Sequence, residues 1–339
     1  MIDSALLIRA LIGLLPVLCF LAALLALDSY KLVRLPMVTA VIAMGCMAAG
    51  VCYLANRAAI GWLGLDFGDY ARYGAPLVEE SVKGAVILLL IRTHRIGFLV
   101  DASVFGFAVG TGFAMIENLY YLNEMTDPHL AIWIVRGFGT AILHGGVQAI
   151  FAAMVLANTD QRGAMDVRAV VPPLILAVLV HAAFNHFVLP PIQQTLLVLL
   201  CLPPLMLWVF VRSERAVEGW IGTGFDADRE LLELLDSGAF SESHAGQYLY
   251  ALRARFPGEV VADLVCYLRL HVELALRAKG VLMMRENGIE VDAADAQTRE
   301  KFEEMRYLER SVGRTALRTL QPLLHMSRRD LWQLYMLGK

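Results

Sequence analysis

Charged side chains are scarce in this chain. Asp, Glu, Lys and Arg together make up 18% of its 339 residues, whereas hydrophobic residues make up 58%. This composition excludes an ordinary soluble enzyme and predicts an integral membrane protein. The net charge is only −3, with no excess of basic residues, so we expect no nucleic-acid partner.

Paired cysteines are absent as well. The sequence has five cysteines without any CxxC or CxxxC spacing, and four of them lie in apolar runs, where cysteine acts as a small core residue: Cys19, Cys46, Cys52, Cys201 and Cys266. The sequence therefore predicts neither a disulfide framework nor a cysteine-based metal site.

The charges that do occur are unevenly distributed. Residues 1–212 hold 12 basic and 12 acidic residues, whereas residues 213–339 hold 17 and 20. A membrane-spanning helix needs about 20 apolar residues. The first region contains seven such runs, at residues 5–27, 36–56, 74–91, 97–122, 130–157, 170–189 and 193–211. The first run is too long for a signal-peptide core and has no small-x-small cleavage site, so we expect it to span the membrane.

The second region is predicted to be helical, but it contains no apolar run long enough to span a membrane. Its apolar residues recur at helical spacing, and Ser237-Gly238, Pro257-Gly258 and Asn287-Gly288 divide it into four or five helices. We therefore expect an all-α protein, with a polytopic membrane helix bundle of about seven spans at 1–212 and a helical cytoplasmic domain at 213–339. Nothing in the second region indicates its role, and a cytoplasmic partner for it is an expectation only.

Basic residues predict the orientation in the membrane. Lys and Arg accumulate in cytoplasmic loops, and they follow the first, third, fifth and seventh spans, as at Lys31, Arg92, Arg162 and Arg212. We therefore expect the protein in the inner or plasma membrane, among lipids, with its N-terminus outside and its C-terminus in the cytoplasm.

Some polar residues lie inside the predicted spans. An ionisable group at the bilayer centre costs at least about 2.5–3.5 kcal/mol on insertion scales, so it is a functional candidate by default. Four spans carry such residues: Glu79, Glu80 and Lys83; Glu117; His144 and Gln148; and His181 and Asn185. We interpret Arg136, near the start of the span at 130–157, as an anchor at the membrane interface.

Helical spacing and depth group these residues. Four-residue separations place Glu79 with Lys83, His144 with Gln148, and His181 with Asn185 on shared helix faces. With a rise of 1.5 Å per residue, the candidates lie about 6–12 Å below the outer face of the membrane. The sequence therefore predicts one polar layer in the outer leaflet.

Carboxylates beside imidazoles can activate water, and two chemistries fit. In one, Glu117, His144 and His181 hold a zinc ion and another Glu is the general base. In the other, no metal takes part: a Glu activates water directly, and His181 with Asn185 stabilises the oxyanion. Because adjacent carboxylates repel each other when both are ionised, either Lys83, one turn from Glu79, keeps the pair charged, or one Glu stays protonated as an acid.

The order of these motifs carries a resemblance. The sequence has no HExxH, no GxGD and no GxSx on a span, but it has EExxK at 79–83, FxxxE at 113–117, and two later membrane histidines, the second in HxxxN at 181–185. Over residues 70–190 this pattern resembles the PrsW family of intramembrane proteases, relatives of the CAAX prenyl endopeptidases and bacteriocin-processing enzymes. Those CAAX-type relatives have FxxxH where this chain has FxxxE.

The resemblance implies a multi-span peptidase, metal-dependent or glutamic, that cleaves membrane-anchored proteins such as single-pass anti-sigma factors. Carried over by position, its active site would comprise Glu79, Glu80, Glu117, His144, His181 and Asn185. An intramembrane endopeptidase is our leading hypothesis.

Two hypotheses of other classes compete. A proton- or cation-coupled carrier would use the same residues as a relay, but it predicts repeated halves and polar groups at several depths. We see no repeat between the first three spans and the next three, and the single polar layer argues against a carrier. A non-enzymatic membrane sensor or scaffold would act through the cytoplasmic helices at 213–339.

Overall fold

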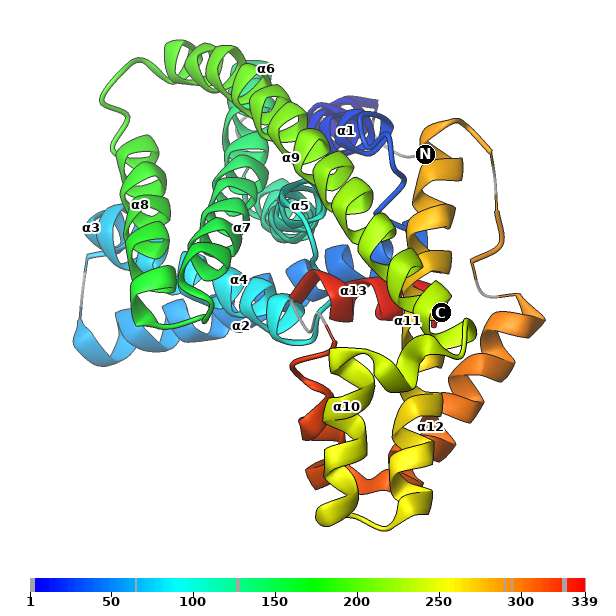
Figure 1. The fold of residues 1–339 in the computed structure, drawn as a ribbon. Helices are drawn as coiled ribbons and strands as arrows, with labels where there is room; N and C mark the ends of the chain where they lie inside the picture. Colours follow the sequence, from blue (N-terminus) through cyan, green and yellow to red (C-terminus); the bar gives the residue numbers. More distant parts are fainter. Residues whose placement is uncertain are drawn as a thin grey trace. The chain divides into compact units, whose positions relative to one another are not determined.

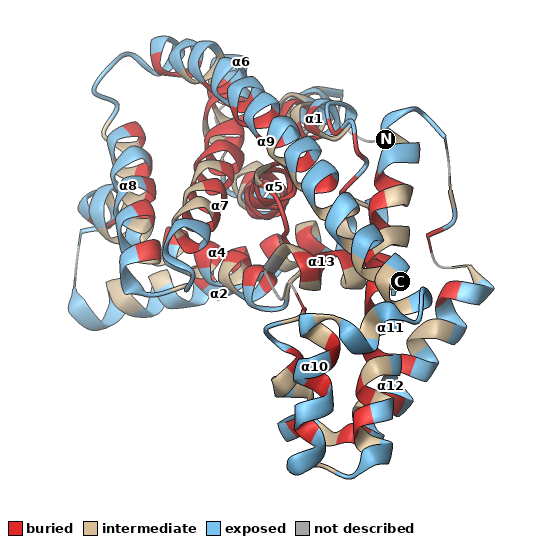
Figure 2. Cartoon of the chain, viewed as in Figure 1, coloured by how far each residue is buried: buried red, intermediate tan, exposed pale blue. Residues whose placement is uncertain are grey.

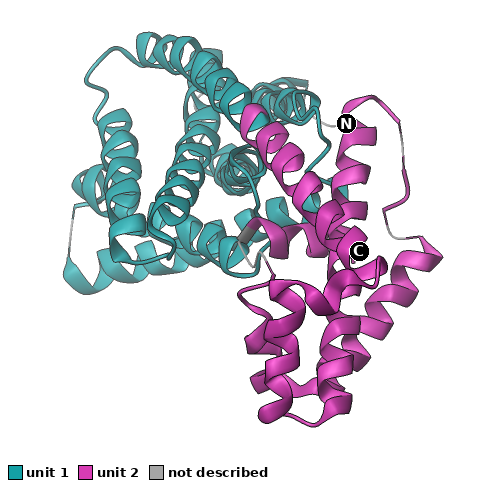
Figure 3. Ribbon diagram, in the orientation of Figure 1, with its two compact units in different colours: residues 1–214 teal, residues 215–339 magenta. Residues whose placement is uncertain are grey.

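The structure is a computed structural model that describes residues 4–64, 66–125, 129–289, 291–293, 295–324 and 328–338. Within these ranges every regular element is a helix, which confirms the all-α prediction (Figure 1). The chain forms two compact units, residues 1–214 and 215–339 (Figure 3). The helix α9 belongs to both.

The first unit contains the membrane spans. Its helices are α1 (Ser4–Ala26), α2 (Leu35–Leu63), α3 (Phe67–Asp69), α4 (Ala75–Arg92), α5 (Leu99–Glu124), α6 (Leu130–Ile134), α7 (Ile142–Arg162), α8 (Val167–Asn185) and the first part of α9 (Pro191–Asp236). Among the described residues, six helices are long and apolar enough to cross a membrane, with 130–162 counted as one. The one predicted span not among these six is the third, at residues 74–91, which corresponds to α4, an 18-residue helix that carries four charged residues.

Helix α5 forms the core of the first unit. All its residues from Val100 to Ala114 are buried (Figure 2), as expected for a helix that is apolar on every side and surrounded by others. Its glycines allow close packing on α7, because a side chain at Gly106 or Gly110 would collide with the backbone at Gln148 or His144. The backbone of α7 therefore lies directly against α5 at the height of His144.

Two π-helical turns lie next to the site helices, and the second of them interrupts the run at 130–157 that the sequence predicts as one helix. The turn η1 (Tyr70–Gly74) precedes α4, and the turn η2 (Val135–Ala141) precedes α7. A π turn inserts an extra residue into the helical ladder and is frequent at functional sites. Both turns come shortly before predicted site residues, since Glu79 and His144 follow them by five and three positions.

The second unit contains the remainder of α9, followed by α10 (His244–Ala251), α11 (Gly258–Glu286), α12 (Ala296–Leu317) and α13 (Arg328–Leu337). The helix breaks fall at the predicted Ser237-Gly238, Pro257-Gly258 and Asn287-Gly288 positions. The predicted end of the last span at residue 211 is not a helix end, because α9, which is 46 residues long in total, runs on to Asp236. No proline occurs between Pro204 and Pro257 to stop it, and Gly238, with φ 74°, follows its end.

Candidate active site

Polar side chains of α4, α5, α7 and α8 meet inside the first unit. Glu80 and Lys83 are fully buried, and His144 and His181 are 2% and 3% exposed. Six of the seven predicted site residues form one connected network: Glu79, Glu80, Lys83, Glu117, His144 and His181. Asn185 is the exception.

Glu80 is the centre of this network. Its Oε1 accepts a hydrogen bond from Lys83 Nζ at 2.6 Å and lies 2.7 Å from His181 Nδ1. Its Oε2 accepts from Gln148 Nε2 at 2.6 Å. Lys83 thus pairs with Glu80, three residues away, rather than with Glu79 as its helical spacing indicated. Positions three and four apart are both within reach on a helix, and Glu80 is the carboxylate that faces the interior with Lys83.

Glu117 holds the second histidine. Its Oε2 lies 2.7 Å from His144 Nε2, and its Oε1 accepts from Arg136 Nη2 at 3.1 Å. The other ring nitrogen of His144, Nδ1, lies 3.0 Å from Lys83 Nζ. Each imidazole therefore contacts a carboxylate through one ring nitrogen, and each of those carboxylates also pairs with a cationic side chain.

Glu79 differs from the other two carboxylates. Its Oε2 lies 3.9 Å from His181 Nε2, and its side chain is 15% exposed. Its Oε1 accepts a long hydrogen bond of 3.4 Å from Asn56 Nδ2, and Asn56 in turn accepts from the Tyr70 hydroxyl at 2.9 Å. No Lys or Arg in the described part of the chain pairs with Glu79. Glu79 therefore has oxygen lone pairs to offer a ligand.

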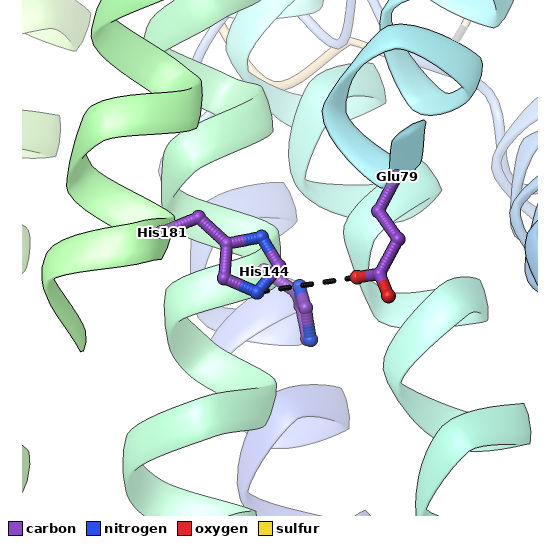
Figure 4. Close-up of side chains that lie close together, drawn as sticks. All are labelled: Glu79, His144 and His181. Carbon is purple, nitrogen blue, oxygen red and sulfur yellow. Dashed lines mark ion pairs between the residues drawn. The ribbon is translucent and has the colours of Figure 1, made fainter. Parts of the chain in front are cut away.

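Three of these residues can hold a metal ion. Glu79, His144 and His181 each offer one ligand atom, and these atoms lie within 4.8 Å of one another (Figure 4). Two imidazoles and one carboxylate form a donor set of catalytic zinc sites. Glu80 orients His181 and Glu117 orients His144, as carboxylates commonly orient metal-binding histidines. The residues therefore fit a zinc ion once His144 Nδ1 exchanges its contact with Lys83 Nζ for the metal. Glu79 then takes the place that the sequence analysis gave to Glu117.

Comparison with known proteins assigns the family. The family model described as "PrsW family intramembrane metalloprotease" matches residues 34–211, more than half of the chain. The chain belongs to the PrsW family. This confirms the resemblance seen in the sequence and makes the protein a multi-pass intramembrane peptidase. No significant match was found among the curated proteins or among the solved structures.

Two residues of the PrsW-like motifs lie at the edge of the network. Asn185 donates from Nδ2 to the carbonyl oxygen of Ala71 at 3.0 Å, so it ties α8 to the turn η1 rather than pointing at the histidines. Phe113 forms an apolar wall, with its ring centroid 5.0 Å from that of His144 and 4.4 Å from Lys83 Nζ. The amide of Asn185 is thus already engaged by backbone.

Sequence reasoning missed other members of this PrsW-family site. Arg136, interpreted as an interfacial anchor, instead pairs with Glu117 and donates from Nε to Asn118 Oδ1 at 2.9 Å. The available signal was its position inside a predicted span, where a charge needs a partner. Asn56 and Tyr70 gave no such signal, because neither carries a charge and both lie outside the motifs.

Proposed function

We propose that this peptidase hydrolyses a peptide bond of a membrane-anchored protein with a water molecule activated among Glu79, His144 and His181. One observation carries the proposal. Of the three carboxylates in the network, Glu80 and Glu117 are paired with Lys83 and Arg136, whereas Glu79 has no such partner in the described residues and faces the imidazoles.

Neighbouring residues orient the histidines beside Glu79 and compensate the other buried charges. Glu80 accepts at the Nδ1 side of His181, which leaves Nε2 of that ring directed toward Glu79. Lys83 and Arg136 compensate the buried charges of Glu80 and Glu117, because an unpaired ion in an apolar interior is costly. Water that enters through the partly exposed Glu79 edge therefore meets a preorganised set of donors and acceptors.

The catalytic type remains a choice between two mechanisms for the same residues. A zinc ion held by Glu79, His144 and His181 would lower the pKa of a bound water and polarise the scissile carbonyl. In the glutamic mechanism Glu79 takes the proton of the water directly, and His181, when protonated, donates from Nε2 to the developing oxyanion. Both mechanisms need the Glu79 carboxylate.

Replacing that carboxylate tests the function. We expect Glu79→Gln to slow cleavage of a co-reconstituted single-pass protein by about 10²–10⁴-fold, because it removes the general base or a metal ligand. The matched control is Glu124→Gln, which changes an exposed carboxylate of α5 and should leave cleavage unchanged. Wild-type cleavage by Glu79→Gln, with the protein inserted normally, would refute the proposal.

A metal assay separates the two mechanisms. The zinc mechanism predicts about one zinc per chain in the purified protein, loss of cleavage on chelation, and recovery on adding zinc. A metal-free preparation that cleaves at the full rate selects the glutamic mechanism.

We further propose that the protein lies in the inner membrane with its N-terminus outside and residues 213–339 in the cytoplasm, so that cleavage occurs near the outer face. The loop charges support this orientation. Cys266, an exposed cysteine of the second unit, provides a probe. A membrane-impermeant thiol reagent should label Cys266 only after the cells are permeabilised, and labelling in intact cells would reverse the orientation.

A further inference from the structure

Helix α1 lies outside the matched family region, which begins at residue 34, yet its backbone is connected to the site. We propose that α1 positions the Glu117–His144 pair through Asn118 and Arg136, which act as positioning residues. This inference rests on the proposed peptidase function of the site.

The connection starts at a proline inside α1. Pro16 has no backbone N–H, so the Ile12 carbonyl lacks its usual helical donor. A side chain at Gly137 in the turn η2 would collide with this same carbonyl oxygen. The neighbouring carbonyl, that of Gly13, accepts a hydrogen bond from Asn118 Nδ2 at 2.7 Å. Two successive carbonyls of α1 therefore contact η2 and α5.

Asn118 passes this contact to Arg136. Asn118 is 2% exposed, and its Oδ1 accepts from Arg136 Nε at 2.9 Å. Its orientation is determined, since only the amide nitrogen can donate to Gly13 and only the amide oxygen can accept from the guanidinium. The Arg136 guanidinium also lies 3.7 Å from the ring centroid of Tyr121. The guanidinium of Arg136 is thus held at its edge by Asn118 and on its face by the ring of Tyr121.

Arg136 in turn fixes the carboxylate that holds His144. Its Nη2 donates to Glu117 Oε1 at 3.1 Å, and the other oxygen of Glu117 lies 2.7 Å from His144 Nε2. His144 supplies one of the three clustered ligand atoms, whereas Asn118 and Arg136 supply none. The series from Gly13 through Asn118, Arg136 and Glu117 to His144 therefore sets the direction of one imidazole.

Asn118→Leu tests this series, because it removes both the donor to Gly13 and the acceptor for Arg136 at nearly constant size. Outer partners of site histidines typically contribute about 10–100-fold to activity. We expect kcat to fall by about that factor and KM to change less than about twofold, because substrate contacts remain. The matched control is Asn123→Leu, which replaces an exposed asparagine of the same helix and should match wild type in both constants.

Two further variants break the series elsewhere. Arg136→Lys keeps the charge but loses the fork that joins Asn118 to Glu117, and Gly137→Ala disturbs the contact with Ile12. Both should lower kcat as Asn118→Leu does, whereas Gly61→Ala, where nothing lies within 4 Å, should not. The double variant Asn118→Leu/Arg136→Lys should be about as slow as the slower single variant, because both changes interrupt one series.

These outcomes decide the inference separately from the function. The inference is overturned if Asn118→Leu keeps the wild-type kcat, if it raises KM alone, or if the double variant is the product of the two singles. If Asn118→Leu inserts poorly, the single variants Arg136→Lys and Gly137→Ala decide instead, and a wild-type kcat in both overturns the inference. Glu79→Gln reports on the function itself: an inactive Glu79→Gln beside a fully active Asn118→Leu and Arg136→Lys refutes only the role of α1.

Discussion

At the scale of single residues, the pair of Lys83 and Glu80 shows how charge is accommodated in the apolar interior. Both side chains are fully inaccessible, and they lie 2.6 Å apart. Removing one member of a buried ion pair usually costs about 3–5 kcal/mol, because the other charge is left uncompensated. Lys83 therefore compensates the buried charge of Glu80, and removing Lys83 alone should destabilise the fold.

This compensation gives a stability prediction. Lys83→Met should lower the free energy of unfolding by about 3–5 kcal/mol, whereas the double variant Lys83→Met/Glu80→Gln should recover part of the loss, because no lone charge remains buried. Denaturant titration of the protein in detergent measures both. Equal losses in the single and double variants would show that the stability depends on packing rather than on charge.

The sequence predicted which residues gather here better than how they pair. Four-residue spacing placed His144 with Gln148, and both contact the Glu80–Lys83 pair. It could not tell whether Glu79 or Glu80 pairs with Lys83, because that depends on how far α4 is rotated against its neighbours. Arg136 reaches Glu117 from within the π turn η2, which spacing on a regular α-helix does not describe.

At the scale of elements, close packing of α5 on α7 determines the position of His144. A side chain at Gly110 would collide with the carbonyl of His144 and with the backbone of Gly145. Small residues at such positions are what allow membrane helices to approach. Because α5 carries Glu117 and α7 carries His144, this close contact brings the two residues together.

Substituting this glycine should therefore affect both stability and cleavage. We expect Gly110→Ala to destabilise the protein by about 1–3 kcal/mol through overpacking and to reduce cleavage by shifting His144. Gly50→Ala is the control, since nothing lies within 4 Å of that position, and alanine there should stabilise α2 by up to about 1 kcal/mol. Thermal unfolding and the cleavage assay distinguish the two, and a harmless Gly110→Ala would contradict the packing argument.

Element boundaries were predictable at breaks that contain glycine or proline, but a change from apolar to charged composition did not always mark one. The apolar runs and the glycine-containing breaks marked most helices. The end of the seventh apolar run did not mark a helix end, because α9 passes from apolar to charged residues without a proline until Pro257. A change from lipid-like to water-like composition indicates a change of solvent rather than of backbone geometry.

At the scale of the whole molecule, the second unit has a buried polar group of its own. His271 of α11 is 5% exposed, and its Nδ1 has no hydrogen-bond partner in the described parts of the chain. Burial lowers the pKa of His271 below its ordinary value of 6.5, and the nearby Lys279 acts in the same direction, whereas Asp228 and Asp330 oppose it. His271 is therefore neutral in the folded unit near pH 7.

This makes the second unit sensitive to acid. The folded state binds the His271 proton less tightly than the unfolded chain does. The contribution of His271 to the free energy of unfolding is therefore fully present above about pH 6.5, and it decreases as the pH falls below that value. In the full-length protein, we expect amide hydrogens of α11 to exchange faster at pH 5.5 than at pH 7.5, after correction for the intrinsic rates. His271→Phe should remove this difference, because the replacement cannot take up a proton. The exposed His244 provides the control, and His244→Gln should keep the full difference; equal pH dependence in His271→Phe and wild type would show that another group is responsible.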